Sequence, residues 1–169
     1  MLISEATRDQ LNELVKYSFD ANSVVDNYAY NLAYYRYPNI EKIVHGSFAH
    51  KFPEFADIIT DMMIRLDARP VRKEVEKHEE DFDGNLYRIF EGVLGLCNDY
   101  RRSIIKVIEV AELNEDYEVK IRLEEFLVMF EHYRKQADVW FEYAKRYQDD
   151  YKSFDVHFAD FTTLISVVD

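Results

Sequence analysis

The fold class is decided by one stretch of the sequence, residues 117–150: YEVKIRLEEFLVMFEHYRKQADVWFEYAKRYQDD. Its apolar side chains recur every three or four residues, which is the period of one face of an α-helix. This stripe consists of Val119, Leu123, Phe126, Phe130, Tyr133, Ala137, Trp140, Ala144 and Tyr147. A helix of roughly 30 residues is about 45 Å long, and only side-by-side packing against other helices buries a stripe of that length.

The same period occurs in three other segments. They cover approximately residues 4–36, 39–67 and 86–114. Pro38 ends the first segment and Pro70 follows the second, as expected for residues that cannot continue a helix. Only four glycines and three prolines interrupt the chain, so turns are few and β architectures are disfavoured. The sequence predicts an all-α protein with four long helices.

The lengths of the connections predict how these helices are arranged. The first and second are joined by a very short turn, as are the third and fourth, whereas the mostly charged residues 71–84 form a long connector with at most a short helix. We therefore expect two antiparallel hairpins joined by a crossover, in up-down-down-up order. Residues 1–152 would form this four-helix bundle. Residues 153–169 would form an aromatic and apolar tail that packs against a neighbouring subunit, because a closed four-helix core leaves it no room.

Composition narrows the classes of function. The chain has 33 acidic and 21 basic residues and a formal net charge of −12. Such a field repels phosphate backbones, so we expect no nucleic-acid partner. No uncharged run approaches the roughly 18 residues of a membrane span, which predicts no membrane partner. A start without a basic and apolar leader, and a single cysteine, Cys97, predict a cytoplasmic protein without an intrachain disulfide.

A candidate metal site lies along one face of the second segment, residues 39–67. On a helix, His50, Glu54, Asp57 and Asp61 fall within about 60° of one another. The apolar side chains Val44, Phe48, Phe55, Ile58 and Met62 are predicted on the opposite, inward face. Carboxylate and imidazole groups at this spacing suit iron, or another divalent metal such as zinc. The alternative is a solvated acidic face, and Pro53 would force a kink within this helix.

A metal site inside the bundle is not expected. Di-iron centres in bundle cores use a glutamate three residues before a histidine, so that both side chains reach one metal. None of the five histidines, His45, His50, His78, His132 and His157, has a glutamate at that position. The sequence therefore favours a site on the surface of the bundle.

Further motifs are residues 95–101 (GLCNDYR), residues 107–116 (VIEVAELNED) and residues 57–66 (DIITDMMIRL), the last with two acids four apart before Pro70. Together with residues 11–15 and 24–25, they resemble the Dps-like miniferritins of the ferritin-like superfamily. Residues 95–101 and 107–116 resemble the third helix of that family and the turn after it, residues 57–66 its second helix, and residues 11–15 and 24–25 its first. The resemblance implies the ferritin-like bundle that the loop lengths also predict.

The resemblance further implies a hollow homo-oligomer, at least a dimer and usually a dodecamer. Such proteins oxidise ferrous iron with peroxide, store the ferric product and protect against oxidative stress. Their iron site lies between two subunits, where histidines of the first and second helices face an acid pair of the partner. Asp57 and Asp61 match that pair. Glu41 and His45 lie near the ligands of the second helix, with one extra residue before Asp57, whereas residues 4–36 contain no histidine.

Two functions therefore remain open from the sequence. The first is a Dps-like protein that binds iron between subunits through Asp57 and Asp61, with help from His50, Glu54, Glu41 or His45, and that could act as a ferroxidase. The second is a ferritin-like scaffold that has lost the ferroxidase site and acts through oligomerisation or protein partners. The absence of a histidine in the first helix favours the second function, and the acid pair favours the first.

Overall fold

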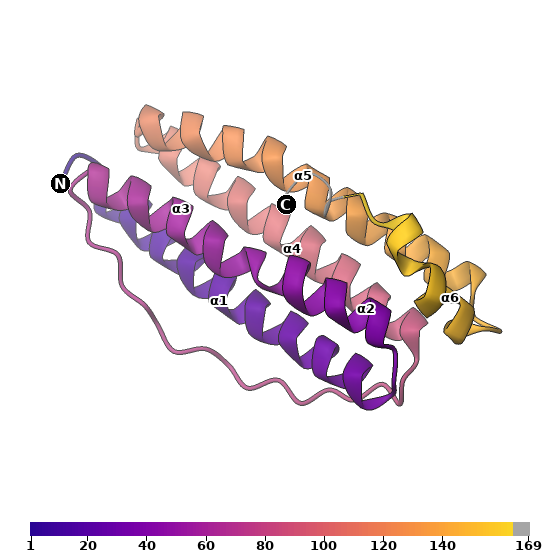
Figure 1. The fold of residues 1–169 in the computed structure, drawn as a ribbon. Coiled ribbons are helices and arrows are strands. Elements are labelled where there is room, and N and C mark those ends of the chain that lie inside the picture. Colours follow the sequence, from indigo (N-terminus) through magenta and orange to yellow (C-terminus); the bar gives the residue numbers. More distant parts are fainter. Residues whose placement is uncertain (164–169) are drawn as a thin grey trace.

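The computed structural model describes residues 1–163, and all the regular elements of this range are helices. They are α1 (Glu5–Tyr34), α2 (Pro38–Ile43), the π-helix η1 (Val44–Ala49), α3 (Lys51–Arg65), α4 (Leu86–Leu113), α5 (Tyr117–Arg146), α6 (Tyr151–His157) and the 3-10 helix η2 (Phe158–Phe161). One antiparallel hairpin contains α1 against α2, η1 and α3, and the other contains α4 and α5 (Figure 1). The predicted four-helix bundle and its topology are confirmed.

The crossover between the hairpins runs in extended form along the length of α1 (Figure 1). Residues 68–82 contain no helical turn, so the short helix considered for residues 71–84 is absent. Side chains of α1 hold this segment in place. His78 Nε2 lies 2.9 Å from Asp20 Oδ1, and the amides of Asn27 and Asn31 donate to the carbonyl oxygen of Glu80. The crossover is thus fixed to the surface of α1 and contributes little to the core.

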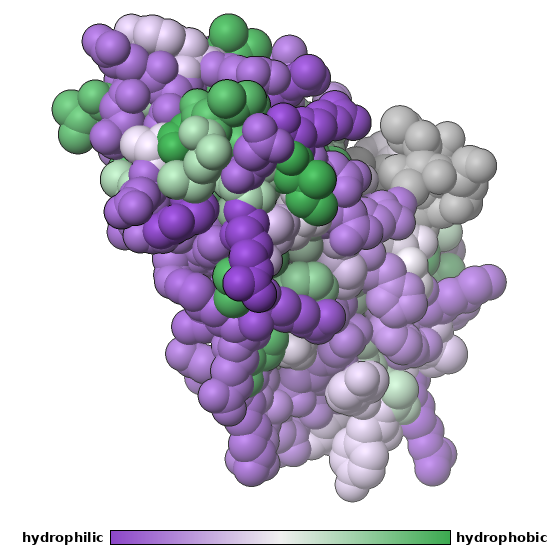
Figure 2. Space-filling view, turned by 90° about the vertical axis from the view of Figure 1, so that its left-hand side faces the viewer, coloured by the Kyte–Doolittle hydropathy of each residue, from purple (hydrophilic) through white to green (hydrophobic). Residues whose placement is uncertain are grey.

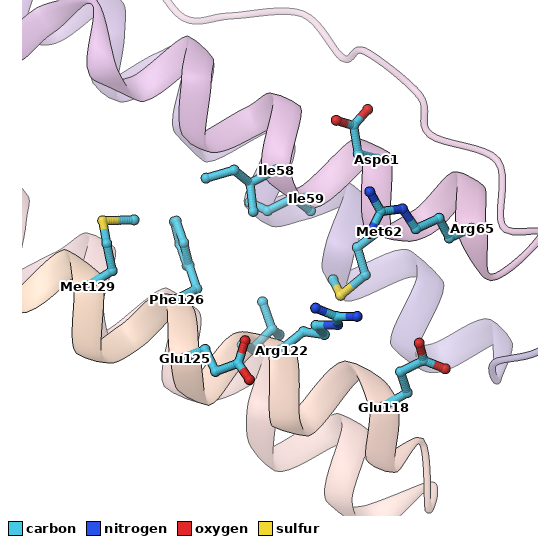
Figure 3. A pocket seen from close by; sticks show the side chains of 11 residues that line it. Ile58, Ile59, Asp61, Met62, Arg65, Glu118, Arg122, Glu125, Phe126 and Met129 are labelled. Atoms are coloured by element: carbon cyan, nitrogen blue, oxygen red, sulfur yellow. The ribbon is translucent and has the colours of Figure 1, made fainter. Parts of the chain in front are cut away.

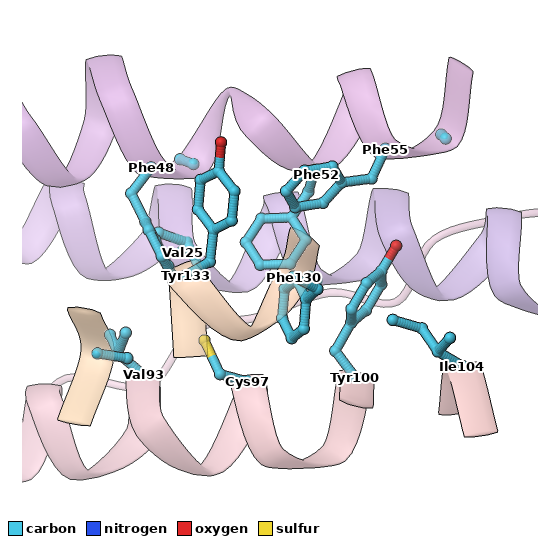
Figure 4. Packing of buried hydrophobic residues seen from close by; sticks show 14 of the residues in the cluster. Val25, Phe48, Phe52, Phe55, Val93, Cys97, Tyr100, Ile104, Phe130 and Tyr133 are labelled. Carbon is cyan, nitrogen blue, oxygen red and sulfur yellow. The ribbon is translucent and has the colours of Figure 1, made fainter. Parts of the chain in front are cut away.

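The centre of the bundle is filled by aromatic rings (Figure 4). Phe52 and Phe55 of α3 meet Tyr100 of α4 and Phe130 of α5, with ring centroids 4.9 to 6.5 Å apart. These separations are typical of attractive edge-to-face and offset contacts. The rings are buried and fill the space between the long helices, so the middle of the interior is mainly aromatic.

The predicted helix over residues 39–67 is divided by the π-helix η1. Phe55, Ile59 and Met63 are buried, whereas Ile58, which we expected to face the core, is half exposed and Met62 is only partly buried. The buried residues follow one another at four-residue spacing, so Ile58 and Met62 lie beside this face. Pro53 lies in the first turn of α3, where its missing N–H group removes no hydrogen bond of that helix.

The predicted packing of the tail against a neighbouring subunit is wrong for the residues that the structure describes. Phe154 and Phe158 are fully buried in the core of their own chain. Phe158 stacks on Trp140 with centroids 5.2 Å apart, and Trp140 Nε1 donates to Thr162 Oγ1 at 2.9 Å. The open end of the bundle beyond α2 provides the room. The remaining apolar residues of the tail, 164–169, lie outside the described range.

Within residues 1–163, no helix combines the length and the hydropathy that are required to cross a bilayer.

Candidate metal centre

Three potential metal ligands from two sides of the first hairpin converge at its surface. Asp26 belongs to α1, His45 to η1, and His50 follows η1 directly. One ligand atom of each side chain lies within 4.8 Å of the other two. The imidazole rings of His45 and His50 are 4.9 Å apart and inclined by 68°. A carboxylate and two imidazoles form a donor set that suits Fe²⁺ and leaves coordination positions open.

The π-helix explains why the two histidines meet. Residues five apart on an α-helix point about 140° away from each other. The wider turn of η1 brings His45 and His50 to the same side instead. π-turns within α-helices occur frequently at functional sites, and here the π-turn lies at the candidate centre.

Asp26 is the member of the cluster whose environment fits a cation best. Its Oδ1 atom is buried and, within residues 1–163, has no hydrogen-bond partner. His45 Nε2 lies 3.7 Å from this atom. Burial raises the pKa of the Asp26 carboxyl, and His45 and His50 oppose this increase. An unsatisfied buried carboxylate oxygen is costly, and a metal ion would remove that cost.

Glu41 supports His45 from the opposite side. Its Oε1 atom lies 3.3 Å from His45 Nδ1, one helical turn away. Metal-binding histidines commonly donate the other ring N–H to a carboxylate, which fixes the tautomer and the ring orientation. Glu41 would assign the proton of His45 to Nδ1 and leave Nε2 free to bind a metal beside Asp26. Glu41 is therefore placed as an outer-shell partner of His45.

The predicted acidic residues of α3 do not join this cluster. Glu54, Asp57 and Asp61 are exposed on α3, and Glu54 pairs with Lys51 at 3.3 Å. Asp61 borders a groove of about 360 Å³ between α3 and α5, beside Arg65 (Figure 3). Of the six predicted ligands, the structure thus brings together His45, His50 and Glu41.

The groove at this end of the bundle is lined largely by apolar side chains. Its floor contains Ile59, Met62, Leu123 and Phe126, and charged residues of both signs form its rim. In the view onto this end, hydrophobic residues gather within a largely hydrophilic surface (Figure 2). The floor offers no metal ligand other than the thioether of Met62, so the groove differs in chemistry from the cluster at Asp26.

The interior that residues 1–163 form contains no buried histidine or glutamate. The buried carboxylate of Asp155 accepts hydrogen bonds from the backbone N–H groups of Asn39 and Ile40 and so caps α2. Cys97 is fully buried, and burial raises the pKa of its thiol, which disfavours the thiolate that metals bind.

Asp26 is the residue that sequence reasoning missed. It lies on α1, among residues 4–36, which contain no histidine. The distance between Asp26 and His45 depends on the register of α1 against η1. Local sequence patterns do not predict that register.

A bundle of two antiparallel hairpins joined by one long crossover defines the ferritin-like class of helical proteins. The model of the ferritin-like domain family matches residues 8–146, and the chain belongs to this family. No curated protein matches the sequence significantly.

Several solved structures have a fold similar to that of this chain. An open-pore ferritin from the hyperthermophilic archaeon Archaeoglobus fulgidus superimposes with a TM-score of 0.86 at 14% identity, over 94% of this chain and 96% of that chain. Two iron-soaked variants of PmFTN each superimpose with a TM-score of 0.79 at 16% identity. They cover 90% of this chain and 98% or 99% of their own. At these identities the likeness concerns the fold alone.

Proposed function

We propose that this ferritin-like protein binds ferrous iron at the surface of its first hairpin, through Asp26, His45 and His50. The observation that carries the proposal is the buried Asp26 Oδ1, which has no hydrogen-bond partner within residues 1–163 and lies beside two histidines. Two ligand atoms on one ion are at most about 4.2 Å apart, which is twice a bond of about 2.1 Å. Atoms within 4.8 Å of one another need only small side-chain rotations to reach one ion. The iron-soaked structures of similar fold support iron as the metal.

The proposal includes the inter-subunit arrangement that the Dps-like resemblance implies. Three protein ligands leave an iron ion open on its solvent side, and Asp57 and Asp61 are exposed carboxylates on the same hairpin. In a homo-oligomer, Asp57 and Asp61 of a second copy would close the site. Oxidation would then balance as two ferrous ions, one hydrogen peroxide and two protons giving two ferric ions and two water molecules.

The alternative function is a ferritin-like scaffold that has lost its ferroxidase site and acts through oligomerisation or protein partners. The aromatic filling of the bundle centre favours this alternative, because it leaves no interior position for iron. The two functions differ in one measurable property, which is saturable binding of iron by the folded protein.

The test is an anaerobic titration with Fe²⁺, followed by peroxide while ferric absorbance is recorded. We expect saturable binding in the wild type and its loss in a His45→Ala/His50→Ala variant. An Asp57→Ala/Asp61→Ala variant should bind more weakly if a second copy completes the site. Glu74→Ala/Glu76→Ala is the matched control, because it removes two exposed acids of the crossover that lie outside the cluster. Equal binding by wild type and the histidine variant would refute the site.

A further inference from the structure

One side-chain contact fixes the end of the π-helix to α1. Asn22 precedes Asp26 by one turn of α1, and its Nδ2 atom donates to the carbonyl oxygen of Ala49 at 2.8 Å. Ala49 is the last residue of η1 and immediately precedes His50. The bond therefore joins the two sides of the candidate centre, one turn from Asp26 on α1 and one residue from His50.

The carbonyl that Asn22 contacts lacks its usual helical partner. In an α-helix, the carbonyl of Ala49 would accept a hydrogen bond from the N–H group of the residue four positions later. That residue is Pro53, which has no N–H group. Ala49 is fully buried, and a buried carbonyl without a donor is costly. The amide of Asn22 provides the missing donor from a neighbouring helix.

The same bond sets how η1 lies against α1. A regular helix would place His45 and His50 on different sides, and the π-turn alone fixes only their angle to each other. Their distance from Asp26 depends in addition on the register between the two helices. The contact between Asn22 and Ala49 is a directional bond across that boundary, adjacent to the cluster.

We propose that Asn22 is a positioning residue for the metal centre. By holding the Ala49 carbonyl, it fixes η1 on α1 so that His50 faces Asp26 and His45. This inference rests on the proposed function, because it requires that the cluster binds a metal. Outer-shell partners of metal ligands typically change affinity by 10- to 100-fold. Asn22 acts through the backbone next to a ligand, so we expect an effect of about tenfold.

A matched control exists on the same helix. Asn31 also lies on α1, and its Nδ2 atom donates to a backbone carbonyl, that of Glu80, at 2.7 Å. This bond holds the crossover and not η1. Replacing Asn22 or Asn31 removes the same kind of hydrogen bond from the same helix. A purely structural role of Asn22 would therefore give both variants the same metal-binding properties as the wild type.

The experiment is a titration of the full chain with Co²⁺, in which the visible ligand-field spectrum reports the geometry around the ion. The variants are Asn22→Ala, Asn22→Gln and Asn31→Ala, each checked for helical content by circular dichroism. We expect about tenfold weaker binding and an altered spectrum for Asn22→Ala. Asn22→Gln keeps the amide donor and should partly restore both, and Asn31→Ala should resemble the wild type.

Two results would overturn the inference, and they differ in what else they imply. Wild-type affinity and spectrum in Asn22→Ala, together with clear binding by the wild type, would overturn the role of Asn22 and leave the proposed function intact. Absence of Co²⁺ binding by the wild type would overturn both.

Discussion

The hydroxyl oxygens of Ser18 and Tyr100 lie 2.7 Å apart at the buried centre of the bundle. Ser18 Oγ also donates to the carbonyl of Leu14 at 2.8 Å, so in this geometry Tyr100 donates its hydroxyl hydrogen to Ser18. Both polar groups are satisfied by each other and by the backbone. The centre of this ferritin-like bundle is therefore complete with protein atoms alone.

This pair gives a first prediction about stability. Tyr100→Phe should lower the free energy of unfolding by about 1 kcal/mol, the typical net contribution of a buried hydrogen bond. Ser18 keeps its bond to Leu14, which limits the loss. The measurement is urea unfolding followed by circular dichroism. Tyr30→Phe, at an exposed position, is the control and should leave stability unchanged; an equal loss in both variants would contradict the assignment.

The buried tyrosines also predict an alkaline limit to stability. Burial raises the pKa of Tyr17 to about 12, and it raises the pKa of Tyr100 further. Tyrosine in the unfolded chain ionises near pH 10, so the stabilising contribution is complete below about pH 10 and is lost as pH rises towards 12. The free energy of unfolding should be lower at pH 11 than at pH 9. In Tyr100→Phe this pH dependence should be weaker; an unchanged slope would exclude Tyr100 as a source.

Replacing Asp26 with asparagine should raise the stability of the metal-free protein and abolish its stabilisation by metal. Because burial raises the pKa of its carboxyl, the ionised form costs stability at neutral pH and the cost disappears only on acidification. Asp26→Asn should therefore raise the thermal midpoint of the metal-free protein slightly, by less than about 4 °C. Fe²⁺ at 100 times its Kd should stabilise the wild type by about 2.7 kcal/mol, but not the variant. A stabilisation of the variant equal to that of the wild type would contradict the role of Asp26.

The cap that Asp155 of α6 provides for α2 gives a prediction about stability. Asp155 accepts hydrogen bonds from the backbone N–H groups of Asn39 and Ile40 at 3.0 and 2.9 Å. Asp155→Ala leaves these donors without their acceptor, which should cost about 1 to 3 kcal/mol. Asp160→Ala removes an exposed carboxylate that pairs only weakly with His157, at 3.5 Å, and should cost less than about 0.5 kcal/mol. Chemical unfolding of both variants distinguishes the two cases.

The sequence predicted the bundle because helical period and loop length are local properties. Pro38 and the stripe from Val119 to Tyr147 mark helix boundaries and buried faces without reference to distant residues. The expected inward position of Ile58 was wrong for a reason that is also physical. After η1 the buried face runs through Phe55, Ile59 and Met63, so Ile58 lies beside it. Residues 44–49 also carry no pattern that distinguishes a π-turn from an α-turn.

The candidate site was predictable only in part for a related reason. His45, His50 and Glu41 lie on one continuous segment. Helical spacing selected His50, and the resemblance to the Dps-like miniferritins selected Glu41 and His45. Asp26 contributes from another helix, and its contact with His45 depends on how α1 and η1 pack. The α3 acids were selected by the same spacing argument, yet each sits at the surface without a histidine beside it. Side-chain convergence between helices is a tertiary property that one helical face does not reveal.

The extended crossover has a consequence for the order of folding. Each hairpin joins helices that are adjacent in the sequence, whereas docking of α1 on α4 joins residues as distant as Ser18 and Tyr100. Local contacts form quickly, and contacts between distant residues wait for loop closure. We expect the hairpins to form first and to dock later, with the crossover settling onto α1 last. Kinetic φ-values near zero at Asn31 and higher at Phe130 would agree with this order, and the reverse ranking would refute it. The segment that links the two halves would then be the last part of the molecule to become ordered and the first to detach.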